Sequence, residues 1–258
     1  MTLSIIILTR DEERHIRDCL ASVRDFADEL LVFDSGSLDR TVEIAREMGA
    51  RVEARPFDDF AKQRNAAIAA AHGDWIFFID ADERATKALG QEIRFVVENC
   101  PSSVAGFWIA RRNVIFGKEI KYTGWSPDYQ PRILRKGRGR FDPTREVHEL
   151  IVWDGETRNL REPLIHFNYD TLAQFRRRNI NYTRYEARIW FEAGKRARWR
   201  GLIGQPLREF WRRYIILSGW KDGAHGLLLS VLMAYYALVR WKMLRRMQGQ
   251  PLGGRISL

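Results

Sequence analysis

Short apolar runs alternate with stretches of helical periodicity over the first hundred residues. The runs predict strands and the stretches between them predict helices, in the order Ser4–Leu8, Glu12–Val23, Leu30–Phe33, Thr41–Met48, Val52–Ala54, Phe60–Ala71, Trp75–Ile79 and Ala85–Val97. Four strand–helix units in succession predict an α/β fold with a parallel, doubly wound sheet.

Three of these predicted strands end in polar residues: Thr9-Arg10-Asp11, Asp34-Ser35-Gly36-Ser37 and Asp80-Ala81-Asp82. The carboxyl ends of parallel strands lie at the same edge of a sheet, where ligands bind in α/β folds. Turn and helix-cap chemistry explains any one of these loops by itself. Three polar ends at one edge favour a ligand site.

Asp80 and Asp82 follow five consecutive apolar residues, which are typical of a strand covered on both faces. Their spacing offers two carboxylates to a hard divalent cation and leaves coordination positions free for water and phosphate oxygens. An isolated Asp-x-Asp is more often a polar strand end. The wider pattern must therefore decide whether it binds metal.

From Ala105 to Asp154 the pattern becomes strand-like with interruptions, as expected for the antiparallel part of a mixed sheet. After about Tyr169 the chain turns helical and basic. We therefore expect one domain over residues 1–169 and a helical C-terminal region over residues 170–258.

Charge is divided unevenly between these two parts. Residues 1–170 carry 25 Lys and Arg against 29 Asp and Glu, whereas residues 171–258 carry 18 against 4, a net charge of +14. Such a basic region suggests contact with a polyanion, either an anionic membrane surface or a nucleic acid. The two cysteines are too few for a disulfide framework, so a reducing, cytoplasmic location is expected.

The basic region contains two segments suited to a membrane surface. On a helix over Thr171–Ala193, one face carries apolar and aromatic residues and the opposite face carries arginines; the apolar set is Phe175, Tyr182, Tyr185 and Ile189. The charge-free run Gly226–Val239 is followed at once by four basic residues, and it suits an interfacial or a core helix. The alternative is a packed helical subdomain with a solvated basic face. No nucleic-acid-binding signature is present, so that partner is not expected.

In order along the chain, a set of segments resembles the family 2 glycosyltransferases of the GT-A fold, closest to the branch that builds lipopolysaccharide core. These segments are Ser4–Glu12, Val32–Thr41, Lys62–Asn65, Trp75–Glu83, Gly124–Arg132, Val147–Glu149 and Gly219–Gly223. The resemblance implies a Rossmann-like mixed sheet flanked by helices, extended here by the basic C-terminal helices.

The resemblance also implies roles for residues at the strand ends. The nucleoside and ribose contacts would be Thr9, Asp11, Glu13 and Asp34, with Arg64 facing the nucleotide. Carboxylates suit this role because they accept hydrogen bonds from imide and hydroxyl donors. Asp82 would be the principal ligand of Mg²⁺ or Mn²⁺, with Asp80 on the ribose or the metal and His148 completing the set.

Inversion by direct displacement needs one general base for the acceptor hydroxyl. By resemblance this base is Asp128, although related enzymes carry a Glu-Asp pair where this chain has Pro127-Asp128. Glu149 and Glu146 are the rivals. For both rivals, simple pairing with a nearby arginine is the alternative.

The function expected from the resemblance is transfer of a hexose, with glucose as first candidate, from a UDP-sugar to a lipid-anchored glycan such as lipopolysaccharide inner core. Transfer to polyisoprenyl phosphate or another envelope glycan is an alternative, as is a non-catalytic nucleotide-sugar-binding scaffold. The expected location is cytoplasmic and peripheral, on the inner face of the cytoplasmic membrane.

Overall fold

The structure is a computed structural model that describes residues 1–143 and 151–249. The chain forms two compact units: Met1–Arg112 with Pro127–Phe167, and Asn113–Ser126 with Asn168–Leu258. Each unit is described separately below. Three predicted site residues, Glu146, His148 and Glu149, lie outside the described residues.

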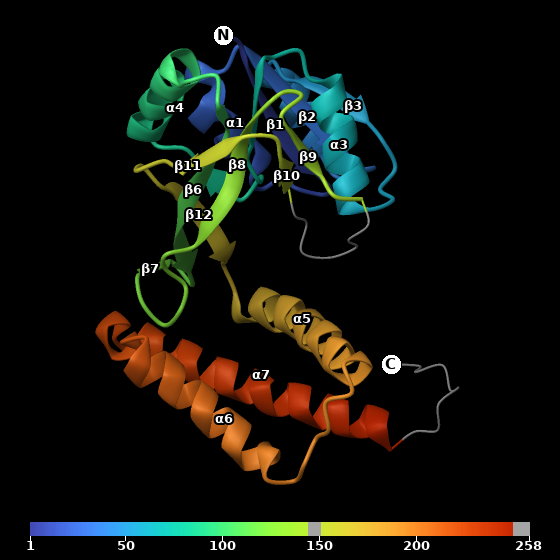
Figure 1. The fold of residues 1–258 in the computed structure, drawn as a ribbon, viewed down its shortest axis with the longest axis vertical. Helices are drawn as coiled ribbons and strands as arrows, with labels where there is room; N and C mark the ends of the chain where they lie inside the picture. The colour runs from blue at the N-terminus through green and yellow to red at the C-terminus, as the bar shows by residue number, and fades with distance from the viewer. Residues whose placement is uncertain (144–150, 250–258) are drawn as a thin grey trace. The chain divides into compact units, whose positions relative to one another are not determined.

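The first unit begins with the predicted alternation of strands and helices (Figure 1). Its elements are β1 Leu3–Thr9, α1 Ile16–Val23, η1 Arg24–Phe26, β2 Glu29–Asp34, α2 Thr41–Glu47, β3 Arg51–Ala54, α3 Phe60–Ala70 and β4 Trp75–Phe78. β2 pairs in parallel with both β1 and β3, and β1 pairs in parallel with β4. The predicted parallel sheet is confirmed in the order β3-β2-β1-β4.

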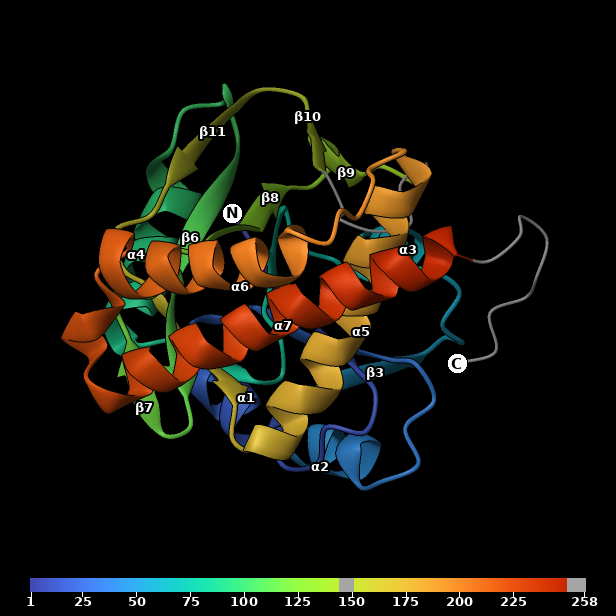
Figure 2. The ribbon, with the colours of Figure 1, turned by 90° about the horizontal axis from the view of Figure 1, so that it is seen from below.

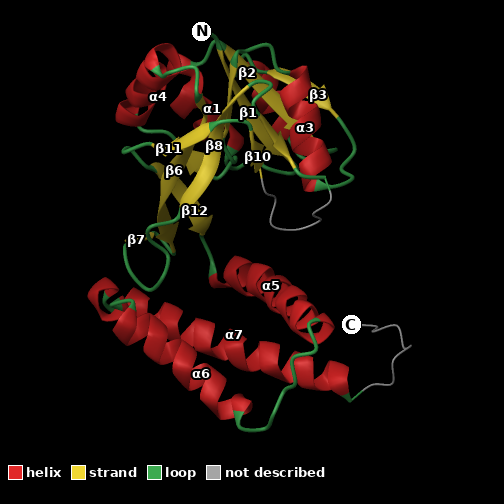
Figure 3. Ribbon diagram, viewed as in Figure 1, coloured by secondary structure: helices red, strands yellow, loops and turns green. Residues whose placement is uncertain are grey.

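The chain then adds further strands. The elements are β5 Glu83–Arg84, α4 Lys87–Asn99, β6 Val104–Ile115, β8 Tyr129–Arg135, β9 Gly139–Phe141, β10 Ile151–Trp153, β11 Glu156–Asn159 and β12 Leu164–Tyr169. β9 and β10 form a separate two-stranded sheet, and β11 pairs in parallel with β6. β8 runs antiparallel to β4 on one side and to β6 on the other. Helices and this mixed sheet, distinguished in Figure 3, give the GT-A arrangement predicted from the resemblance.

Apolar side chains fill both faces of the sheet. Ile5 and Phe77 belong to a cluster that includes residues of α1 and α4, whereas Ile6 and Phe78 belong to a second cluster that includes residues of α3. Successive strand residues point to opposite faces, so an unbroken apolar run is needed when both faces are covered. This explains why Trp75–Phe78 contains no polar residue.

The second unit is mostly helical. Its helices are α5 Leu172–Glu192, α6 Gly201–Trp211, a π-helical turn η2 Arg212–Ile216, a 3-10 turn η3 Gly219–Asp222, and α7 Ala224–Gln248. The short strand β7, Lys118–Ile120, pairs with the end of β6. α7 packs against both α5 and α6 (Figure 2).

The predicted apolar face of α5 is only partly correct. Phe175 is fully buried, but Tyr182, Tyr185 and Ile189 are exposed. The buried stripe instead runs at intervals of four residues, through Phe175, Asn179, Thr183 and Ala187. At the start of this stripe the Phe175 ring lies 6.0 Å from the ring of Tyr236 on α7.

Asp222, within the Gly219–Gly223 segment, anchors the loop that follows β7. Its buried carboxylate accepts hydrogen bonds from the N–H groups of Lys121 and Tyr122 and from the Thr123 hydroxyl, at 2.9–3.1 Å. A buried carboxylate with three donors is stable, whereas one without donors is costly. This part of the family resemblance therefore has a clear structural role.

Candidate active site

The loops that follow β1 and β2 are joined by side-chain hydrogen bonds around Asp34. Its Oδ1 accepts from the hydroxyl groups of Thr9 and Ser37 at 3.0 and 2.5 Å. Its Oδ2 accepts from the N–H groups of Gly36 and Ser37, both at 2.9 Å, and Gly36 has a φ of +87° that favours glycine. A carboxylate accepts about four hydrogen bonds, so Asp34 is fully used in shaping this edge.

Asp11 and Glu13 make bonds of the same kind. Asp11 has a positive φ of 56°, and its Oδ1 accepts from the Leu38 N–H at 2.8 Å. The Glu13 carboxylate accepts from the Arg40 N–H at 3.1 Å. Both carboxylates therefore connect the first loop to the second.

A pocket of about 350 Å³ lies beside these loops. It is lined by Leu8, Thr9, Arg10, Glu12, Ser35, Phe57, Phe60, Gln63, Arg64 and Asp80. Of the nucleotide contacts expected from the sequence, Thr9, Arg64 and Asp80 line the pocket, and Asp11, Glu13 and Asp34 do not. The pocket therefore lies at the predicted strand ends, while three of the four carboxylates expected there, Asp11, Glu13 and Asp34, support the loops instead.

Sequence reasoning missed the aromatic wall of this pocket. Phe57 and Phe60 are both exposed, and their rings meet edge to face at 4.8 Å. Exposed aromatic side chains offer a surface on which a planar base can stack. Ser35 and Gln63, which hydrogen-bond to each other at 3.1 Å, add polar groups. In the sequence, the signal for this wall was the presence of two phenylalanines, Phe57 and Phe60, at the polar start of a predicted helix.

Carboxylates and arginines alternate in a series of ion pairs that runs from Asp80 to Asp128. Arg132 donates to Asp80 at 2.6 Å and also to Glu83. Arg111 lies 3.6 Å from Glu83 and 2.6 Å from Asp128. Two carboxylates predicted to be functional are therefore linked through one buried glutamate and two arginines.

The pKa values within this series diverge for physical reasons. Burial opposes ionisation of Asp80, but the positive charge of Arg132 lowers the pKa of Asp80 below its usual value. Glu83 is completely buried, and this burial raises its pKa despite the same arginine. The pKa of Arg132 is raised, because its two carboxylates outweigh its own burial. The arginine is charged throughout the physiological range and holds Asp80 as a carboxylate.

Asp82 lies in the turn between β4 and β5, with its side chain 15% exposed, and Oδ2 is 3.7 Å from Nε2 of His166 on β12. Carboxylate oxygens and an imidazole nitrogen suit Mn²⁺, and carboxylates with phosphate oxygens suit Mg²⁺. Within residues 1–143 and 151–249, no three His, Cys, Asp or Glu side chains are grouped to hold a metal ion. In this part of the chain, Asp82 and His166 together offer two candidate ligands, fewer than a closed metal site requires.

His166 was not identified from the sequence. The histidine singled out there was His148, which lies outside the described residues. His166 occupies an ordinary strand pattern, Leu164–Tyr169, and only the packing of β12 against β5 brings it to Asp82.

Asp128, the first candidate for the base, precedes β8. Its Oδ2 accepts from Arg111 Nε at 2.8 Å, and its Oδ1 accepts from the Gln130 amide at 2.8 Å. These bonds fix the orientation of the carboxylate.

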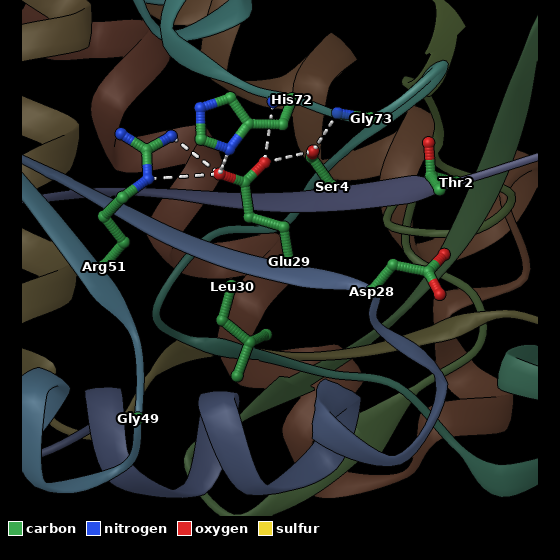
Figure 4. A pocket seen from close by; sticks show the side chains of 9 residues that line it. All are labelled: Thr2, Ser4, Asp28, Glu29, Leu30, Gly49, Arg51, His72 and Gly73. Carbon is green, nitrogen blue, oxygen red and sulfur yellow. Dashed lines mark hydrogen bonds and ion pairs between the residues drawn. The ribbon is translucent and has the colours of Figure 1, made fainter.

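A second pocket, of about 440 Å³, lies at the amino ends of β1 and β2 (Figure 4). Glu29 is at its centre and contacts Arg51 at 2.6 Å and His72 Nδ1 at 3.1 Å. Ser4 donates to the same carboxylate and accepts from the Gly73 N–H. These groups satisfy one another, so this pocket is best explained as a structural ion-pair cluster.

A mixed sheet of this order, with a pocket and an acidic turn at the carboxyl ends of its parallel strands, defines a GT-A glycosyltransferase. The chain belongs to glycosyl transferase family 2, whose family model matches residues 4–183.

Two relatives align over nearly the whole chain. The lipopolysaccharide core biosynthesis glycosyltransferase LpsC of Rhizobium meliloti (strain 1021) is 30% identical, over 93% of this chain and 90% of its own. An uncharacterized glycosyltransferase of Rickettsia conorii (strain ATCC VR-613 / Malish 7), RC0292, is 24% identical over 94% and 89%.

Among solved structures, glucosyl-3-phosphoglycerate synthase from Mycobacterium tuberculosis, in complex with Mn²⁺, UDP and glucosyl-3-phosphoglycerate, is 24% identical with a TM-score of 0.36. The match covers 44% of each chain, so less than half of that enzyme is represented. The family assignment therefore depends on the family model and on the full-length relatives.

Proposed function

We propose that this protein is an inverting, metal-dependent glycosyltransferase that moves a hexose, with glucose as first candidate, from a UDP-sugar to a lipid-anchored glycan such as lipopolysaccharide inner core. One observation carries the proposal. Asp80 lines the 350 Å³ pocket and also begins the acidic turn that contains Asp82. A nucleoside in the pocket would direct its diphosphate towards these carboxylates.

The donor half of the proposal uses the wall of the pocket. Phe57 and Phe60 would stack on the uracil, while Thr9 and Ser35 supply hydrogen-bonding groups beside it. Arg64 lies over the Phe78 ring at 5.3 Å, and its charge helps to lower the pKa of Asp80. A guanidinium in this position would bind an anionic donor.

Asp82 would be the principal ligand of the Mg²⁺ or Mn²⁺ ion, with His166 at 3.7 Å as a second candidate and His148 as a further one. Asp80 would contact the ribose, or the metal through water. The metal would neutralise the charge that develops on the departing diphosphate. Arg132 keeps Asp80 ionised, as its lowered pKa indicates. Asp80 is thereby ready to bind ribose hydroxyls or metal-bound water at neutral pH.

The acceptor half requires a base on the face opposite the diphosphate. We propose Asp128, held by Arg111 and Gln130, as that base. Glu149 and Glu146 stay the rival candidates. A fixed carboxylate orientation supports Asp128, because a base must meet the acceptor hydroxyl at hydrogen-bond distance.

The lipid-anchored acceptor is supported by two observations. The Rhizobium meliloti relative is named for lipopolysaccharide core biosynthesis. The second unit also exposes Ile203, Leu207 and Trp211, which recur at intervals of four along α6 and thus share one face. An exposed apolar face beside many basic residues suits an anionic membrane surface on the cytoplasmic side.

α7 is a further candidate for membrane contact. It is long and apolar enough to cross a membrane by length and composition, and 39% of its apolar window is buried within the protein. Leu229, Tyr236, Trp241 and Leu244 of α7 are buried. A helix with this much internal packing supports peripheral attachment.

UDP release tests the proposed reaction directly. With Mn²⁺ or Mg²⁺, a panel of UDP-sugars should show slow hydrolysis without acceptor and faster UDP release with a lipopolysaccharide inner-core acceptor. Asp82→Ala should abolish both. Asp154→Asn, which changes an exposed acid that pairs with Arg138, is the matched control and should retain both.

Turnover by Asp82→Ala equal to that of the wild type would refute the metal assignment. UDP-sugar binding with no release for any acceptor would instead indicate a non-catalytic nucleotide-sugar-binding protein. Release with polyisoprenyl phosphate alone would replace the acceptor named here.

A further inference from the structure

A pocket of about 610 Å³ lies between α5 and α7, entirely within the second unit. It is lined by Leu172, Ala173, Arg176, Arg177, Ile180, Tyr235 and Tyr236. The five residues from α5 recur at intervals of three and four, so they form one face of its first two and a half turns. The two helices that carry the pocket are visible in Figure 2.

The two arginines of this pocket differ from their neighbours. Along α5, Arg178 donates to the carbonyl of Asn168 and Arg188 pairs with Glu192. Neither Arg176 nor Arg177 makes a hydrogen bond or ion pair with any part of the chain that the structure describes. Two adjacent guanidinium groups thus face solvent at the edge of a concave site.

The rest of the pocket is apolar. Tyr236, which lines the pocket, is buried, and its ring lies 6.0 Å from that of Phe175. Leu172 and Ile180 add aliphatic surface, and Tyr235 is exposed at the rim. A guanidinium pair forms charge-assisted, bidentate hydrogen bonds with phosphate. The adjoining apolar wall would cover the first carbons of an attached chain.

We propose that this pocket binds the phosphate headgroup of an anionic lipid, with Arg176 and Arg177 on the phosphate and Tyr236, Ile180 and Leu172 against the glycerol and first acyl carbons. The biological role of this site rests on the proposed function, because the bound lipid would belong to the membrane that presents the acceptor. Lipid binding itself does not depend on that function.

Binding of a soluble short-chain lipid tests the site without a membrane. Dihexanoyl phosphatidic acid, kept below its critical micelle concentration, is titrated into the full-length protein by calorimetry. The wild type should bind it, and the Arg176→Gln/Arg177→Gln variant should bind about tenfold more weakly or worse, as expected for loss of charge-assisted hydrogen bonds. Dihexanoyl phosphatidylcholine should bind weakly to both.

The matched control is Arg245→Gln/Arg246→Gln, which removes the same charge from two adjacent exposed arginines in the last turn of α7. This control should bind phosphatidic acid as the wild type does. A second variant, Ala173→Trp, keeps both arginines and fills the pocket, and it should also lose binding. Circular dichroism melting verifies that each variant is folded.

Three outcomes would overturn the proposal: no binding by the wild type, equal weakening by the control pair, or equal affinity for inorganic phosphate and phosphatidic acid. The last would show a phosphate site without lipid recognition. UDP release by the wild type is measured separately. Its absence together with specific lipid binding would refute the proposed function and leave this site intact.

Discussion

At the scale of single residues, buried charges at the active site depend on one arginine. Arg132 is 4% exposed and contacts both Asp80 and Glu83, of which Glu83 is fully buried. Pairing offsets the cost of burying a charge, and removing one partner leaves the other uncompensated. Arg132 therefore contributes to the integrity of the site as well as to its electrostatics.

Arg132→Ala should lower the free energy of unfolding by about 3–5 kcal/mol, the usual penalty for an orphaned buried charge. Arg158→Ala, which removes an exposed partner of Glu156, should cost about 1 kcal/mol or less. Urea denaturation followed by circular dichroism measures both values. Equal stability of the two variants would contradict the importance of the buried cluster.

Glu29 provides a second residue-scale prediction, on pH dependence. Burial disfavours its charge, but hydrogen bonds from the His72 N–H, the Ser4 hydroxyl and Arg51 together lower its pKa. A lowered pKa in the folded state means that the charged form stabilises the fold above the unfolded pKa, near 4.5. This contribution is lost as the pH falls through the folded pKa.

Glu29→Gln should accordingly destabilise the protein by about 1–3 kcal/mol at pH 7. The difference from the wild type should shrink progressively below about pH 4.5. Glu53→Gln, which changes a half-exposed partner of the same Arg51, is the control and should have little effect. A stability difference that is constant from pH 7 to pH 3 would contradict the role assigned to the Glu29 charge.

At the scale of elements, the start of α7 and η3 approach closely because a glycine lies between them. A Cβ built on Gly226 would lie 1.8 Å from the carbonyl oxygen of Gly219, so the backbone would have to move. In contrast, a Cβ on Gly204, inside α6, meets nothing within 4 Å. The two helical glycines therefore make opposite predictions.

Gly226→Ala should destabilise the protein by about 1–3 kcal/mol through overpacking. Gly204→Ala should stabilise it by about 0.5–1 kcal/mol, because alanine has the higher helix propensity. Thermal melting of the two variants beside the wild type tests the pair. A melting temperature for Gly226→Ala at or above that of the wild type would be incompatible with this close approach.

At the scale of the whole molecule, exposed apolar side chains are concentrated in the second unit. Most of the large hydrophobic residues that reach solvent belong to it, including Trp199, Ile216, Trp220 and Val231. The excess of positive charge that gives the chain its formal net charge of +10 also comes from this unit, since residues 1–170 are net acidic. Apolar and basic surfaces on one unit favour an anionic membrane as its partner.

Ile203→Ser/Leu207→Ser/Trp211→Ser should weaken cosedimentation with phosphatidylglycerol-containing vesicles about tenfold or more, because burial of each side chain contributes about 1.5–3 kcal/mol. Binding by the wild type should fall at high salt and with neutral vesicles. Phe95→Ser, which removes an exposed aromatic residue of α4 in the first unit, is the control and should bind normally. Unchanged binding by the α6 variant would exclude this face as the membrane contact.

Much of the first unit could be predicted from the sequence. Its strands follow from local pattern, because β1, β2 and β4 are apolar runs covered on both faces, and α1 buries a regular apolar stripe through Ile16, Leu20 and Val23. The C-terminal region was correctly expected to be helical, but α6 was not delimited within it, although Ile203, Leu207 and Trp211 recur at intervals of four. The apolar face predicted for α5 was wrong at Tyr182, Tyr185 and Ile189, because packing against α7 selected a neighbouring stripe.

The sequence by itself determined the family, the parallel half of the sheet and the edge at which the polar residues collect. Only the tertiary structure decided what each of those residues does. Asp34, Asp11 and Glu13 are occupied by hydrogen bonds between loops, while Phe57 and Phe60 form the pocket wall. His166 reaches Asp82, and Arg132 joins Asp80 to Glu83, through contacts between segments about 50 to 84 residues apart. Local periodicity specifies elements, but the partners of a charged side chain depend on which distant strands pair.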